Sequence, residues 1–171
     1  MITDLNTFVE SIKPQITKID TKIISAFPGT GKTTYFNKHK DECIDSDSSN
    51  FSWIIDDEGN KVRNPEFPNN YINNIKENIG KYKYIFVSSH DDVRNMLLEN
   101  DLFFYLLYPY IDRKDEFIER YKNRGSDEKF IALLEKNWNE WITAIDNTEE
   151  HGFKKFCLEE GNNMEEILPL L

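Results

Sequence analysis

Short apolar runs rich in β-branched residues alternate along this chain with segments of helical periodicity. The runs predict strands at 21–27, 42–49, 82–90, 102–109 and 153–160, and the periodic segments predict helices at 5–12, 35–40, 69–79, 91–100, 112–123, 127–146 and 164–168. Strands that alternate with helices imply parallel strands joined by right-handed crossovers. The sequence therefore predicts a three-layer α/β domain.

One segment departs from this alternation. Residues 53–80 carry two prolines and many asparagines, and they fall between the second and third predicted strands. We interpret them as an insert with its own short helix. No repeat and no linker divides the chain, so a single domain over residues 1–171 is expected.

The charge of the chain limits its partners. The net charge is −10, which argues against stable binding to nucleic acid or to an anionic membrane. No apolar run approaches the roughly 20 residues needed to cross a bilayer. The N-terminus lacks the pattern of a signal peptide, and Cys43 and Cys157 lie outside any CxxC motif. These features favour a small acidic cytoplasmic enzyme of undetermined oligomeric state, in which local arginines can still bind an anionic small molecule.

The stretch AFPGTGKTT, residues 26–34, follows the first strand and opens a helix. It fits the pattern G-x-x-x-x-G-K-[ST], except that Ala26 replaces the first glycine. A methyl group is tolerated there if the backbone keeps a negative φ. Backbone N–H groups would surround a phosphate of ATP, Lys32 would add a charge and Thr33 would offer a hydroxyl to Mg²⁺. The predicted cofactor-binding residues are Pro28, Gly29, Thr30, Gly31, Lys32, Thr33 and Thr34.

Asp45 and Asp47 stand two residues apart at the end of the second strand. If the chain is extended there, both side chains point the same way, toward the edge of the sheet where ligands bind. Asp45 would then hold a Mg²⁺-bound water and Asp47 would meet an acceptor. The alternative is a solvated loop in which aspartate and serine form local turns.

Arginines form a second group of candidates. Arg63 in the insert and Arg94 in the helix at 91–100 are candidates for binding an acceptor phosphate. Counted at about 100° per residue, Arg113, Arg120 and Arg124 lie within about 40° of one another on one helix face. Phe117 is expected on that face, and Tyr121 is expected to point elsewhere. The three arginines would stabilise a transferring phosphoryl group, or they form a solvated face paired with nearby glutamates.

The loop resembles that of the small P-loop kinases, the nucleoside monophosphate kinase group. With DSDSSNFSW, RNPEFPNNY and VSSHDDVR, most of the chain is similar to small phage- or prophage-encoded proteins of this group. The resemblance implies a P-loop NTPase fold with a five-stranded parallel sheet of order 2-3-1-4-5 and helices on both faces. It also implies an acceptor-binding insert at about 53–80, an arginine-bearing lid at about 112–125, adenine beside the loop EEGNNM, and location in the host cytoplasm.

One departure from the family pattern is clear. The third strand ends in Ser88-Ser89-His90, without the aspartate often found there, so the carboxylate for the metal must come from elsewhere. Asp45 and Asp47 are similar to the Asp-x-Asp pair of shikimate-type kinases.

Three functions stay open from the sequence. The first is phosphoryl transfer from ATP to a nucleoside monophosphate or deoxynucleoside monophosphate, which needs arginines and no base. The second is a kinase of a hydroxyl acceptor, such as a nucleoside, a modified base or a polynucleotide end, with Asp47 as base. The third is an ATP-binding regulatory module without transfer.

Overall fold

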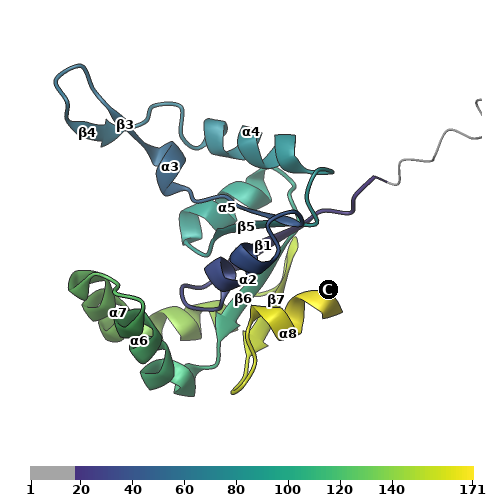
Figure 1. Cartoon of the computed structure of the whole chain (residues 1–171), viewed down its shortest axis with the longest axis vertical. Helices are drawn as coiled ribbons and strands as arrows, with labels where there is room; N and C mark the ends of the chain where they lie inside the picture. Colours follow the sequence, from purple (N-terminus) through teal and green to yellow (C-terminus); the bar gives the residue numbers. More distant parts are fainter. Residues whose placement is uncertain (1–17) are drawn as a thin grey trace, which may run out of the picture.

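A computed structural model describes residues 18–171 of the chain (Figure 1). The helix predicted at 5–12 lies outside the described residues. Five strands form one parallel sheet: β1 (Lys22–Ala26), β2 (Cys43–Asp45), β5 (Tyr84–Ser88), β6 (Phe104–Pro109) and β7 (Phe153–Leu158). The five predicted strands and the α/β class are therefore confirmed.

The strands lie across the sheet in the order β2-β5-β1-β6-β7. Two further short strands, β3 (Trp53–Ile55) and β4 (Lys61–Arg63), pair antiparallel in a separate hairpin within the insert. Counted along the chain without this hairpin, the sheet places its second, third, first, fourth and fifth strands side by side.

Helices connect the strands. They are α2 (Lys32–Lys38), α3 (Ser49–Ser52), α4 (Asn69–Asn78), α5 (Asp91–Glu99), α6 (Lys114–Asn123), α7 (Glu128–Asn147) and α8 (Met164–Ile167), with 3₁₀ turns η1 (Ile111–Arg113) and η2 (Leu168–Leu170). None of the helices in the described part of the chain is long and apolar enough to span a bilayer.

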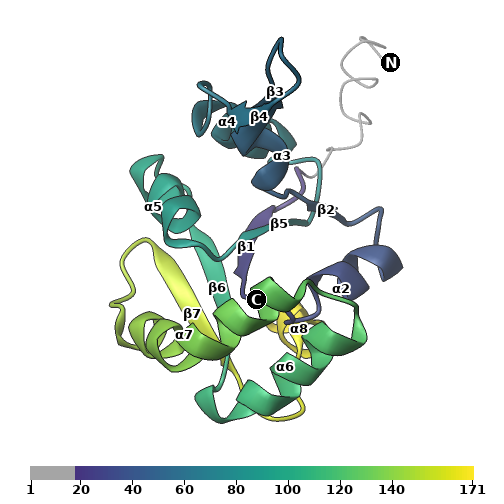
Figure 2. The same cartoon turned by 90° about the vertical axis from the view of Figure 1, so that its left-hand side faces the viewer.

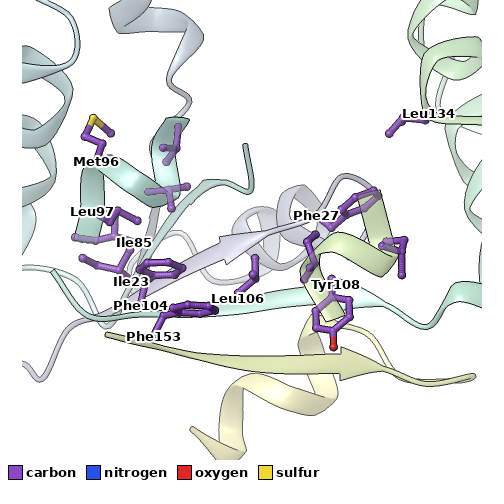
Figure 3. Packing of buried hydrophobic residues seen from close by; sticks show 14 of the residues in the cluster. Ile23, Phe27, Ile85, Met96, Leu97, Phe104, Leu106, Tyr108, Leu134 and Phe153 are labelled. Carbon is purple, nitrogen blue, oxygen red and sulfur yellow. The ribbon is translucent and has the colours of Figure 1, made fainter. Parts of the chain in front are cut away.

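Each face of the sheet is covered by helices because successive strand side chains point to opposite sides. Ile23 belongs to a cluster that packs against α4, α5, α6 and α7, whereas Ile24 belongs to a second cluster with α2 and α8. Figure 3 shows the first cluster, in which the rings of Phe104 and Phe153 stack from neighbouring strands. This arrangement is compatible with the predicted three-layer fold.

The insert and the α6–α7 pair lie at opposite ends of the molecule. Figure 2 shows the hairpin and α4 at the top and α6 and α7 at the bottom. Helix α4 is anchored on the core by its buried residues Tyr71, Ile72 and Ile75. At the other end Trp138 is fully buried and donates a hydrogen bond from Nε1 to the carbonyl of Ile111 at 2.7 Å. The carboxyl ends of the strands lie between the insert and the α6–α7 pair.

Candidate phosphate-binding site

The loop between β1 and α2 has a backbone that only glycines adopt easily. Gly29 has a φ of 84° and Gly31 a φ of 100°, both in the left-handed region. Ala26 is the last residue of β1, is buried, and does not have a positive φ. The condition under which a methyl group is expected to be tolerated at this position, a backbone without positive φ, is therefore met.

Three consecutive carbonyl groups of the loop are bound by other elements. The Tyr121 hydroxyl donates to the Pro28 carbonyl at 2.6 Å, Arg120 Nη1 donates to the Gly29 carbonyl at 2.8 Å, and the Met164 N–H donates to the Thr30 carbonyl at 3.0 Å. Two of the donors come from α6 and the third from the start of α8. These bonds fix the direction of the loop's peptide planes.

The N–H groups of the same loop are left free. Thr30 is the exception, because its N–H and its hydroxyl both donate to the Phe27 carbonyl. The N–H groups that find no acceptor among residues 18–171 are those of Gly29, Gly31, Lys32, Thr33 and Thr34. Free N–H groups in a curled loop form a concave site that suits an anion.

The loop forms part of the wall of a cavity of about 1150 Å³. Its lining comes from the carboxyl ends of β2 and β5, from α2, from α6 and α7, and from the segment after β7. The residues outside the loop are Lys38, Asp45, Asp47, Ser88, His90, Arg120, Asn123, Arg124, Phe130, Asn163, Glu165 and Glu166. The location at the carboxyl edge of a parallel sheet is where ligands bind in open α/β folds.

Lys32 and Asp45 meet inside this cavity. Lys32 Nζ lies 3.5 Å from Asp45 Oδ1, and both side chains are about one quarter exposed. Asp45 Oδ1 is buried and has no hydrogen-bond partner in the described part of the chain. A buried carboxylate oxygen without a donor fits a cation or a cation-bound water, and Mg²⁺ is usually held by one or two carboxylates together with substrate phosphates. Asp45 and the hydroxyl of Thr33 are the residues that would hold it.

Asp47 lies just after β2, where it makes a local hydrogen bond and also lines the cavity. Its Oδ1 accepts a hydrogen bond from the N–H of Ser49 at 2.9 Å, which is the local turn considered as the alternative interpretation. Asp47 is exposed and nevertheless lines the cavity together with Asp45. The sequence prediction that both carboxylates face the same edge of the sheet is consistent with this placement.

Only two of the three predicted lid arginines reach the cavity. Arg120 and Arg124 line it, whereas Arg113 does not. Arg113 is 5% exposed, and its guanidinium donates to the carbonyls of Leu158, Glu159 and Asn162 as well as to Glu116. The helical count placed it wrongly because Arg113 belongs to η1 and precedes α6. Its bonds tie η1 to the end of β7.

Glu116 joins two of these arginines. It accepts two hydrogen bonds at 2.8 Å from Arg113 and a further bond from Arg120 Nη2. The bonds from Arg113, with the charges of both arginines, lower the pKa of Glu116 from 4.5 to about 2. Arg120 is therefore held between Glu116 and the Gly29 carbonyl, with its guanidinium 4.7 Å from the Phe117 ring. Phe117 lies on the arginine face as expected.

The two candidates for an acceptor phosphate lie elsewhere. The Arg63 guanidinium stacks on Trp53 at 4.8 Å and on Phe67 at 5.6 Å within the insert. Arg94 pairs with Asp91, donates from Nε to the Ser89 carbonyl at 3.0 Å, and lines a second, smaller pocket between α5 and α7. Neither arginine is among the residues that line the cavity.

The sequence patterns missed one residue that shapes the loop. Tyr121 is fully buried, holds the Pro28 carbonyl, and lies so close to Gly29 that a Cβ there would come within 2.8 Å of its ring. The expectation that Tyr121 points away from the arginine face is wrong, since the guanidinium of Arg124 lies 5.0 Å from its ring. The signal was present, because Tyr121 stands four residues after Phe117 and three before Arg124.

Comparison with known proteins adds no assignment: no protein-family model and no curated protein matches this sequence.

Proposed function

We propose that this protein is an ATP-dependent phosphotransferase that binds the phosphates of ATP on the loop from Pro28 to Thr34. The proposal rests on the difference between the backbone carbonyl groups and the backbone N–H groups of the loop. Three carbonyls are bound from outside, while five N–H groups are left for an anion in the cavity. The parallel five-stranded sheet with helices on both faces also supports the proposal, because the P-loop NTPase fold that the sequence resemblance implies has such a sheet.

The cavity suggests how the nucleotide lies. On one side of the loop it is lined by Arg124, Phe130 and Asn163, and on the other by Asp45 and Asp47. Arginines favour a polyanionic chain, so the nucleoside of ATP would extend past Arg120 and Arg124 toward α6 and α7. The segment after β7 adds the carboxylates of Glu165 and Glu166 to the cavity lining. The carboxyl ends of β2 and β5 are then left for the acceptor.

Each residue has a defined task in this proposal. Lys32 neutralises the terminal phosphates, and it is already directed into the site by Asp45. Thr33 and Asp45 would hold Mg²⁺, which supplies charge neutralisation on the phosphates when bound. Arg120 and Arg124, which already line the cavity, would stabilise the charge that spreads over the transferring group.

The test is a thermal-unfolding measurement on the full chain with and without ATP and Mg²⁺. We expect ATP to stabilise the protein, because a ligand bound at 100 times its Kd adds about 2.7 kcal/mol. Lys32→Ala should weaken ATP binding about 10- to 150-fold, since a hydrogen bond to a charged group contributes about 1.5–3 kcal/mol. The matched control is Lys40→Ala, because Lys40 is exposed two residues after α2 and does not line the cavity. Absence of any stabilisation of the wild-type protein by millimolar ATP or ADP would rule the proposal out.

A further inference from the structure

We infer that the phosphoryl acceptor is a small uncharged compound that offers a hydroxyl group, and not a nucleoside monophosphate. The inference rests on the proposed function and names the substrate class of the same site. It starts from the charges at the acceptor end of the cavity, where β2 and β5 end.

That end of the cavity carries two carboxylates, a hydroxyl group and an imidazole. Its lining residues are Asp45, Asp47, Ser88 and His90. The cations that line the cavity in the described chain are Lys32, Lys38, Arg120 and Arg124, and they come from α2 and α6 or its C-terminal cap. Lys32 balances the charge of Asp45, but a monophosphate acceptor would still place a dianion beside the carboxylate of Asp47, where like charges repel.

The arginines that a monophosphate would need are engaged in other contacts. The Arg63 guanidinium lies over the rings of Trp53 and Phe67 in the insert, and Arg94 is bound to Asp91 and to the Ser89 carbonyl. The Arg94 side chain is only 14% exposed, so turning it into the cavity would break both bonds and uncover the smaller pocket. The acceptor end therefore lacks the pair of guanidinium groups that recognises a phosphate.

Asp47 supplies what a hydroxyl acceptor needs instead. Its Oδ1 is oriented by the Ser49 N–H, and its Oδ2 makes no hydrogen bond within residues 18–171. During transfer the acceptor oxygen forms a bond to the γ-phosphorus, and the bond from that phosphorus to the β,γ-bridging oxygen breaks. The hydroxyl proton passes to Asp47, and ADP leaves with the electron pair of the broken bond. Asp45 is less suited to this task because it is paired with Lys32.

The experiment follows label from [γ-³²P]ATP with Mg²⁺ into two panels of acceptors. One panel holds ribo- and deoxyribonucleosides, pentoses and hexoses, and the other holds the nucleoside monophosphates and deoxynucleoside monophosphates. We expect label on a member of the first panel only. Asp47→Asn should lower kcat by about 100- to 10,000-fold, the usual contribution of a general base. Asparagine keeps the Oδ1 acceptor for Ser49, so the turn is preserved. The matched control is Asp57→Asn, which removes an exposed aspartate from the insert.

The outcomes separate this inference from the proposed function. The affinity for ATP, measured by thermal shift, should change by no more than about twofold in Asp47→Asn, which assigns the loss to the transfer step. Label on a monophosphate, with turnover unchanged in Asp47→Asn, would overturn the inference and leave the phosphotransferase intact. A parallel reaction offers an oligothymidylate, and label only on its 5′ end would overturn the inference in favour of a nucleic-acid end as acceptor. ATP binding without transfer to either panel or to the oligothymidylate would overturn it in favour of a binding module. A wild-type protein that does not bind ATP would instead remove the proposed function itself.

Discussion

Gly29 suits the loop between β1 and α2 for two separate physical reasons. Its φ of 84° is rarely adopted by residues with a side chain. A Cβ at this position would also come within 2.8 Å of Tyr121 Cε1 and 3.1 Å of Phe117 Cδ1. Gly59, in the turn of the hairpin, has the same φ of 84°, but a Cβ there would meet nothing within 4 Å. A comparison of the two glycines therefore separates the effect of backbone strain from the effect of close packing.

We expect Gly59→Ala to lower the free energy of unfolding by about 1–2 kcal/mol, the cost of the left-handed backbone alone. Gly29→Ala should cost about 1–3 kcal/mol more, because its methyl group also forces α6 away from the loop. Urea unfolding of both variants measures the difference. ATP affinity should fall in Gly29→Ala and stay unchanged in Gly59→Ala. Equal costs in the two variants would mean that the contact between the loop and α6 contributes nothing.

At the scale of single residues, the sequence predicted the loop but not the side chains that bind its carbonyl groups. The glycines, Lys32 and Thr33 are recognisable because a phosphate-binding loop needs those residue types at short, fixed spacing. Tyr121 is 93 residues away from the Pro28 carbonyl that it binds. No local pattern encodes a contact at such a separation, so only the packing of α6 reveals it.

The junction of η1 and α6 depends on one carboxylate. Glu116 has its pKa lowered to about 2 in the folded protein by the hydrogen bonds from Arg113 and the charges of both arginines, compared with 4.5 in an unfolded chain. A lowered pKa stabilises the fold above the unfolded value, and this stabilisation is lost as the pH falls. We expect Glu116→Gln to lower the melting temperature at pH 7. The difference from wild type should shrink between about pH 4.5 and pH 2.

The control for that measurement is Glu119→Gln on the same helix. Glu119 is exposed and makes no ion pair or side-chain hydrogen bond in the described chain. Its substitution should change the melting temperature little at any pH in this range. A gap between wild type and Glu116→Gln that stays constant down to pH 2 would show that packing, and not charge, explains the effect of Glu116.

Among the elements, those with a buried apolar pattern were predictable, and the exposed hairpin was not. The five strands of the sheet and helices α4 to α7 follow from apolar runs and helical spacing. Strands β3 and β4 have three residues each and are mostly exposed, so they carry no alternation of apolar and polar residues. Arg113 was assigned to a helix that begins one residue later, and a turn of 3₁₀ geometry does not keep the 100° step. Both errors come from elements too short to show a period.

Across the whole molecule, burial is concentrated in the middle of the sheet and is low in the inserted hairpin. Ile24, Ile85, Phe86 and Leu106 are fully buried in β1, β5 and β6. The three residues of β3, from Trp53 to Ile55, are all exposed, and within residues 18–171 the hairpin pairs only with itself. An isolated two-stranded hairpin is marginally stable in water. The free energy of opening should therefore differ widely between these two parts of one chain.

We expect native-state hydrogen exchange to resolve this difference. Amides of β1, β5 and β6 should exchange only on global unfolding, with a free energy of about 5–15 kcal/mol that is typical of a domain. Amides of β3 and β4 should exchange through local opening at far lower cost, and their rates should not respond to Gly29→Ala, which lowers global stability. Helix α4 serves as the internal control because Tyr71 and Ile75 anchor it on the core. Hairpin amides as slow as those of β5 at low protein concentration would contradict the prediction. Slowing only at high concentration would instead indicate that exposed Trp53 and Ile55 are covered by a second copy of the chain.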